Sequence, residues 1–147
     1  MPPTGLMKFS SVESIRHFLK DTMSYYEREA DVYSEKVGSL MRILEADSFG
    51  KRPKKLTEVK WDKVGMLMVN EKEPTRGTLE LLVEAMEEYK AKALRTAEIL
   101  TTIDQLEALS LPSNASMVLY VRHGVPVRLV VDTARDPRVD ELLNVVP

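Results

Sequence analysis

The feature that most constrains this chain is a pair of long apolar seams at helical spacing. In each seam apolar residues recur at intervals of three or four, which keeps them on one side of an α-helix. At 1.5 Å per residue each seam is roughly 40–50 Å long, so each helix needs a packing partner along its whole length. The first seam comprises Val12, Ile15, Leu19, Met23, Tyr26, Ala30, Tyr33, Val37, Leu40 and Leu44, and the second comprises Leu79, Leu82, Met86, Tyr89, Ala93, Ala97, Leu100, Ile103 and Leu106.

The seams predict two long antiparallel helices, over residues 10–47 and 76–110. Ser10 or Ser11 is suited to cap the first helix, because a serine hydroxyl satisfies the amide groups left unpaired in the first turn. Thr78 is the expected cap of the second. Gly38 is the weak point of the first helix, at a cost of about 1 kcal/mol relative to alanine. The sequence allows the helix either to continue or to break there.

The connector over residues 51–75 has a different character. Its run 64–69 is apolar and lies between turn-forming residues. A short apolar run of this kind favours a buried strand, expected within 60–69, although a helical turn is compatible with the same pattern.

A second β segment is predicted over residues 117–131. It consists of two runs rich in β-branched residues joined by His123 and Gly124, and a two-residue hairpin loop needs positive φ, which glycine adopts freely. Pairing Arg122 with Val125 defines the faces, both largely apolar, so we expect cover on both sides. One face then carries Val118, Tyr120, Val127 and Leu129, and the other carries Met117, Leu119, Val121 and Val130.

These elements indicate an α+β fold in a single domain, residues 1–147. The two long helices form a hairpin resembling a coiled coil, and a small antiparallel sheet combines the 117–131 hairpin with the 60–69 strand. Pro126 removes one backbone donor and suggests an edge position for its strand. A short helix over 136–144 ends the chain, with Asp136 as its cap and Pro137 at its first position.

Composition restricts the functional classes. The formal net charge of −2 argues against a general electrostatic affinity for nucleic acid or membranes. No cysteine is present, which excludes disulfides and thiolate chemistry. No segment reads as a signal peptide or a membrane span, so we expect a cytoplasmic protein that does not bind membranes. Scarce amides beside many charged residues are typical of thermophile proteins.

One tripeptide resembles a catalytic motif. Arg122, His123 and Gly124 are similar to the Arg-His-Gly signature of the histidine phosphatase superfamily, in which the triplet follows the first strand of a large α/β domain. Here the triplet lies near the end of the chain, and the only other histidine, His17, falls in a predicted helix. We therefore interpret the triplet as a hairpin turn, because a function requires a complete site.

Metal chemistry has equally weak support. Glu13, His17 and Asp21 are spaced to line one helical face, but this row lies off the apolar seam and no second histidine completes a ligand set. The Glu-x-x-His motif of di-iron bundles does not occur. We expect no metal, no cofactor and a non-catalytic protein.

Two surfaces remain as candidates for binding. Basic residues surround one tryptophan in the connector, an arrangement that could neutralise phosphates and stack a base. This possible nucleic-acid patch comprises Lys51, Arg52, Lys54, Lys55, Lys60, Trp61 and Lys63. A row of small residues on the first helix would allow another helix to approach closely. This possible dimer face comprises Ala30, Ser34, Val37, Gly38 and Leu40.

The function expected from the sequence is that of an interaction or scaffold protein. It would self-associate through its long helices, as a dimer that forms a four-helix bundle, or bind a protein partner. The alternative is an accessory subunit that binds nucleic acid through residues 51–63. The two differ in salt dependence, because phosphate contacts weaken steeply as salt is raised.

Overall fold

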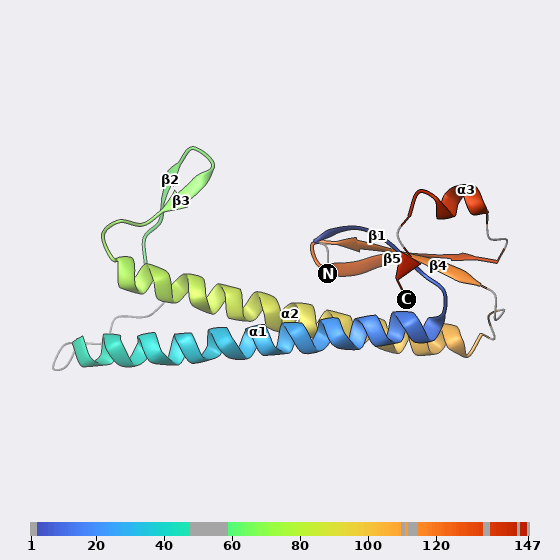
Figure 1. Ribbon diagram of the computed structural model, residues 1–147. Coiled ribbons are helices and arrows are strands. Elements are labelled where there is room, and N and C mark those ends of the chain that lie inside the picture. The colour runs from blue at the N-terminus through green and yellow to red at the C-terminus, as the bar shows by residue number, and fades with distance from the viewer. Residues whose placement is uncertain are drawn as a thin grey trace. The chain divides into compact units, whose positions relative to one another are not determined.

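The computed structural model of the chain describes residues 3–47, 59–109, 111, 115–133, 136–143 and 145–146 (Figure 1). It confirms the α+β class, with two long helices that pack against each other, α1 (Val12–Asp47) and α2 (Pro74–Glu107). Contacts divide the chain into two compact units, both crossed by the two helices. The sheet unit comprises Met1–Tyr26 and Ala91–Pro147, and the hairpin unit comprises Glu27–Lys90.

Helix α1 begins and ends close to the predicted bounds. Ser11 is its cap, since its hydroxyl oxygen accepts a hydrogen bond from the amide of Ser14 at 3.0 Å. The helix runs through Gly38 without a break. Outside the backbone of its own helix, the one described group that a Cβ atom on Gly38 would meet is the Arg42 guanidinium, at 3.7 Å.

Helix α2 begins earlier than predicted, at Pro74, and Thr78 is not its cap. The Thr78 hydroxyl instead donates to the carbonyl of Pro74 at 2.7 Å, a bond within the helix. The side-chain oxygen of Asn70 satisfies the amide of Glu73 at 3.0 Å, just before the first turn. Proline at the first helical position is favourable because its missing N–H needs no partner there.

The sheet unit contains a four-stranded sheet in the order β5-β4-β1-β6, built from β1 (Thr4–Phe9), β4 (Ser116–Arg122), β5 (Val125–Asp132) and β6 (Val145–Val146). Strand β1 pairs antiparallel with β4 and parallel with β6, and β4 pairs antiparallel with β5. The β4–β5 turn is the predicted one, with φ of 53° at His123 and 78° at Gly124. Strand β5 lies at an edge, as Pro126 suggested.

Strand β1 pairs with the β4–β5 hairpin where the sequence analysis placed residues 60–69, so that prediction was wrong. In β1 the side chains alternate, so that Met7 and Phe9 face the core while Leu6 is 52% exposed. Such a short alternating run, interrupted by Gly5 and Lys8, is a weak sequence signal.

A β-bulge changes the faces predicted for the hairpin. Tyr120 pairs with Arg128, and Val121 pairs with Pro126, so Val127 is the extra residue. Because side chains alternate along a strand, one extra residue moves every later side chain to the opposite face. Leu129 therefore packs against the core, and Val130, which is 60% exposed, takes the outer face. The outer face is covered only in part, since Ser116, which also lies on it, is 2% exposed.

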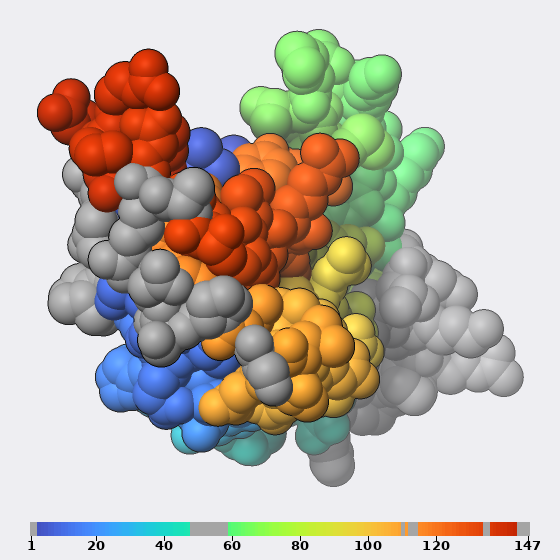
Figure 2. Space-filling view, turned by 90° about the vertical axis from the view of Figure 1, so that its right-hand side faces the viewer, coloured from blue at the N-terminus to red at the C-terminus, as the bar shows by residue number. Residues whose placement is uncertain are grey.

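The core of the sheet unit lies between the inner face of the sheet and the two helices. Its fully enclosed side chains are Phe9, Ile15, Leu19, Ile103, Met117, Leu119 and Val121. In Figure 2 the start of α1 (blue) and the end of α2 (orange) lie side by side below β5 (orange-red). Arg16 joins these helices, since its guanidinium donates to Asp104 at 3.0 Å and also to Glu107. The bonds to Glu107 and Asp104 raise the pKa of Arg16 above its ordinary value.

The predicted terminal helix is shorter than expected. Helix α3 spans Pro137–Asp140, with Asp136 as its cap and Pro137 in its first turn, as predicted. Residues Val145–Val146 form strand β6. The side-chain hydrogen bond from Arg138, reinforced by its backbone amide, holds the pKa of Asp136 below its ordinary value.

The hairpin unit contains the remaining halves of α1 and α2 and a separate two-stranded hairpin. The rings of Tyr33 and Tyr89 stack with centroids 5.7 Å apart, so the two seams pack against each other within the chain. Strands β2 (Asp62–Val64) and β3 (Leu67–Val69) pair antiparallel around Gly65, whose φ is 61°. The run 64–69 is therefore a hairpin, and neither the buried strand nor the helical turn that the sequence allowed.

Candidate interaction surfaces

The β2–β3 hairpin exposes an unusual amount of apolar surface. Met66, at its tip, is fully exposed, and Leu67 is 70% exposed. The members of this apolar tip, all exposed, are Val64, Met66, Leu67, Met68 and Val69. Isolated exposed apolar residues are ordinary on protein surfaces, but contiguous ones mark sites of interaction.

Both faces of the hairpin are open. Val64 pairs with Leu67, and on the opposite face Lys63 pairs with Met68. Every residue of the two strands is exposed. A two-stranded hairpin alone is marginally stable in water, because it has no layer on which to bury its apolar face. No described residue of the hairpin unit covers the apolar tip, so a binding partner would supply the missing burial.

The base of the hairpin, in contrast, is held by specific contacts with α2. The indole N–H of Trp61 donates to the carboxylate of Glu80 at 2.7 Å. On the other strand, Asn70 bonds to the amide of Glu73, and a Cβ atom on Gly77 would meet the Asn70 side chain at 3.3 Å. A firmly held base with an exposed apolar tip is suited to presenting that tip to a partner.

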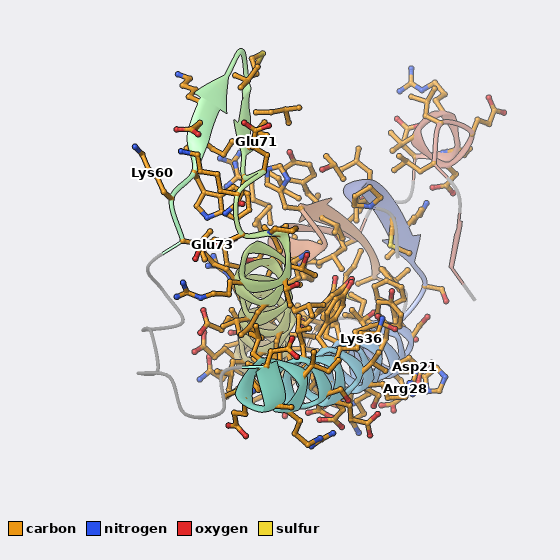
Figure 3. The ribbon with its side chains drawn as sticks, turned by 90° about the vertical axis from the view of Figure 1, so that its left-hand side faces the viewer. Asp21, Arg28, Lys36, Lys60, Glu71 and Glu73 are labelled. Carbon is orange, nitrogen blue, oxygen red and sulfur yellow. The ribbon has the colours of Figure 1, made fainter. Side chains whose placement is uncertain are left out.

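Charges around the base balance. The described cations at the base are Lys60, Lys63, Lys72 and Arg76, and the described carboxylates are Asp62, Glu71, Glu73 and Glu80. Figure 3 shows Lys60 pointing away from the hairpin, with Glu71 and Glu73 on the segment that leads into α2. The described surface therefore has no net positive charge to attract a polyanion.

The predicted nucleic-acid patch is described only in part. Lys51, Arg52, Lys54 and Lys55 lie outside the described residues. Lys60 and Lys63 are exposed, as that prediction requires. Trp61 is half-buried and is engaged by Glu80, so its ring is an anchor of the hairpin base.

The residues of the predicted dimer face differ in their exposure. Ala30 is only 4% exposed within the single chain, so it is not available to a second copy. Ser34 is exposed, and the remaining members of the row are half-buried, namely Val37, Gly38 and Leu40. The part of this face that a second helix could reach is therefore narrower than the sequence implied.

The residues of the other candidate motifs make local hydrogen bonds and ion pairs. Gly124 is buried in the hairpin turn, where the hydroxyl of Tyr26 donates to its carbonyl at 2.5 Å. On the exposed face of α1, His17 Nε2 lies 3.4 Å from the Asp21 carboxylate, while Glu13 pairs with Arg16. Among the described residues, no group of three His, Cys, Asp or Glu side chains is placed to hold a metal ion.

In the same part of the chain, no helix has the length and apolarity that crossing a membrane requires.

A hollow of about 590 Å³ lies in the sheet unit between α2 and the edge strand β5. Its walls include Arg95, Ile99 and Leu106 from α2, and Arg128 and Leu129 from β5. The described residues of its walls include no histidine or serine, and the hydroxyl of Thr102 donates to the carbonyl of Glu98 within the helix. The lining thus offers apolar surface and charge, without a nucleophile paired to a base.

Sequence reasoning did not find the hairpin tip, whereas Pro126 correctly suggested that β5 lies at an edge. Gly65, in the middle of the apolar run 64–69, was the available signal for a turn, since glycine within a strand pattern often marks a change in backbone direction. The exposure of that run had no signal, because an apolar hexapeptide reads as buried.

Comparison with known proteins adds no relative. The chain matches no protein-family model, no curated protein and no solved structure.

Proposed function

We propose that this chain is a non-catalytic interaction protein that docks the apolar tip of its β2–β3 hairpin onto an apolar surface of a protein partner. The observation that carries the proposal is the exposure of Met66, Leu67 and their apolar neighbours on both faces of the hairpin. Methionine suits such a contact, because its flexible and polarisable side chain adapts to an irregular surface.

Among the described residues the hairpin base carries no excess of cations, and this supports a protein partner. Proteins bind nucleic acid and anionic membranes through an excess of Lys and Arg side chains. Four cations lie beside four carboxylates in the described part of the base, which suits the mixed polar rim of a protein interface. Binding through residues 51–63 to nucleic acid is the alternative, and its main cations lie outside the described residues.

Self-association through the long helices also remains a proposal. The seams that suggested it pack against each other within one chain, as the Tyr33–Tyr89 stack illustrates. A second copy would have to use the outer face of α1, where Ser34 is exposed and Gly38 has room beside it. Gly38→Leu and Leu40→Glu should then weaken association more than they change helix content.

The test is site-specific photo-crosslinking in the source cells. A photoreactive phenylalanine analogue replaces Met66, and the matched control carries it at Leu94, an apolar residue 68% exposed on α2 in the other unit. A protein joined to position 66 and not to position 94 is then purified and its affinity measured. The measurement is made with wild type and with the Met66→Ser/Leu67→Thr variant, at low and high salt.

The proposal expects one purified protein whose affinity falls at least about tenfold in the double variant and changes little with salt, as for apolar contacts. It fails if that affinity is unchanged by the substitutions. It also fails if the wild-type chain instead binds single-stranded oligonucleotides or anionic lipid vesicles and releases them when salt is raised.

A further inference from the structure

Strand β5 is an open edge of the main sheet. It lies at the end of the strand order, and no strand among the described residues pairs with its outer side. Pro126 and the bulge at Val127 obstruct only its beginning. The remaining stretch, from Arg128 to Asp132, contains no proline, so its backbone can accept another strand.

The register determines which backbone groups point outward. Arg122 and Val125 close a two-residue turn, so they form a hydrogen-bonded pair, and such pairs alternate with non-hydrogen-bonded pairs along an antiparallel ladder. Because β4 carries no extra residue, Tyr120 and Val118 bond inward to Arg128 and Val130. The N–H and C=O groups of Leu129 and Val131 therefore point away from β4, towards the open edge.

The side chains of this stretch form a self-complementary pattern. On the outer face of the sheet, Arg128 and Asp132 flank Val130, which is 60% exposed. On the inner face, Leu129 and Val131 pack against the core yet stay half-buried, since nothing described covers them at the edge. Read in the opposite direction, the stretch again presents a charge, three apolar residues and the opposite charge.

We propose that two copies of this chain pair through their β5 edges, antiparallel about a twofold axis at Val130. Arg128 then lies opposite Asp132 of the second copy, and Leu129 lies opposite its Val131. Leu129 and Val131 supply the backbone hydrogen bonds of this ladder, as their outward groups require. Twofold symmetry repeats each contact, so both arginines meet an aspartate and the sheet continues from one copy into the other.

Charge selects this register over its neighbours. Centring the axis on Leu129 would place Arg128 opposite Val130, so that Arg128 and Asp132 of the second copy would no longer oppose each other. Centring it on Val131 would place Asp132 opposite Val130. Only the axis at Val130 opposes unlike charges and keeps the apolar residues together, and opposed unlike charges stabilise a cross-strand pair. The inference is independent of the role proposed for the β2–β3 hairpin, which belongs to the other unit.

The first test uses the absence of cysteine from the chain. In the proposed pairing the two copies of residue 130 form a non-hydrogen-bonded pair with Cα atoms about 4.5 Å apart, within the range that a disulfide spans. Val130→Cys is oxidised with diamide and separated on a non-reducing gel. The matched control is Leu6→Cys, on the same outer face at β1 and 52% exposed, away from the β5 edge.

A covalent dimer from Val130→Cys and none from Leu6→Cys is the expected result. Equal crosslinking of the two variants, or none of either, would overturn the inference.

The second test exchanges the charges. Arg128→Asp and Asp132→Arg each place like charges opposite one another, and we expect each to raise the dimer dissociation constant at least about tenfold. The double variant restores unlike pairs and should recover most of the affinity. Sedimentation velocity measures association, and circular dichroism confirms that each variant is folded. A wild-type dimer that is unaffected by the single reversals, or a wild type that stays monomeric at millimolar concentration, would refute β5 pairing.

Discussion

Replacement of Gly124 by alanine should be the most damaging small substitution in the sheet unit. Gly124 has a φ of 78°, where a side chain costs roughly 1–2 kcal/mol. A Cβ atom there would lie 2.5 Å from the hydroxyl of Tyr26, closer than carbon and oxygen can approach. Tyr26 is 5% exposed and its hydroxyl bonds to the Gly124 carbonyl, so displacing it adds roughly 1–3 kcal/mol.

The two contributions sum to roughly 2–5 kcal/mol, a large part of the stability of a small protein. Removing the Tyr26 hydroxyl separates them. Tyr26→Phe alone should cost about 1–2 kcal/mol for the lost hydrogen bond. In the double variant the clash is gone, because the nearest ring carbon would be 3.6 Å from the new Cβ. The double variant should therefore be about as stable as Gly124→Ala alone.

The assay is urea unfolding followed by far-UV circular dichroism for the four proteins of this cycle. We expect a coupling free energy of about 1–3 kcal/mol between the two positions. Simple addition of the two single costs would show that Tyr26 does not hold the turn. A cost below about 1 kcal/mol for Gly124→Ala would refute the backbone argument as well.

Three further outcomes follow from local contacts. Gly38→Ala should stabilise the chain by roughly 0.5–1 kcal/mol in the same assay, because alanine is favoured in a helix and the added Cβ would contact just the Arg42 side chain among the described groups. A destabilised variant would show that the glycine serves close packing. Asp140→Ala should lower the free energy of unfolding by roughly 2–4 kcal/mol, because it leaves the ammonium group of Lys8, which is 5% exposed and paired with Asp140, buried without its counter-charge. Lys8→Met should cost less stability. The reverse order of the two variants would contradict the explanation by an unpaired buried charge. The pKa of Asp136 is lowered in the folded chain, so its ionised form stabilises the folded state at pH values above the unfolded pKa of about 4, and this stability is lost as pH falls through the folded pKa. The stability advantage of wild type over Asp136→Asn should therefore be present at pH 6 and shrink below about pH 4. A difference in stability that does not depend on pH would exclude the charge as its cause.

The long helices were predictable because their signal is local and repeated. The seam of α1 recurs along a helix of 36 residues, and caps such as Ser11 and Asp136 act within three residues of their own position. The β4–β5 turn was predictable for the same reason, since the positive φ of His123 and Gly124 is a property of two adjacent residues. None of these features depends on distant parts of the chain.

The strand pairing was not predictable from local patterns. Strand β1 is recognisable only beside β4, more than a hundred residues away in sequence, and its own pattern is weak. The bulge at Val127 reversed the faces of every residue that follows it, although composition and alternation looked regular. Residue periodicity carries no information about where one extra residue is inserted.

Taken by itself, the sequence determined where this chain forms long helices and where it turns, because hydrogen bonding within four residues and the allowed φ of single residues decide both. The tertiary structure alone decided what is covered. It buried Ala30, left Met66 and the apolar tip in solvent, and placed Arg128 and Asp132 on an open edge. Burial depends on which distant segments meet, and so the surfaces proposed for binding emerged only once the strands were paired.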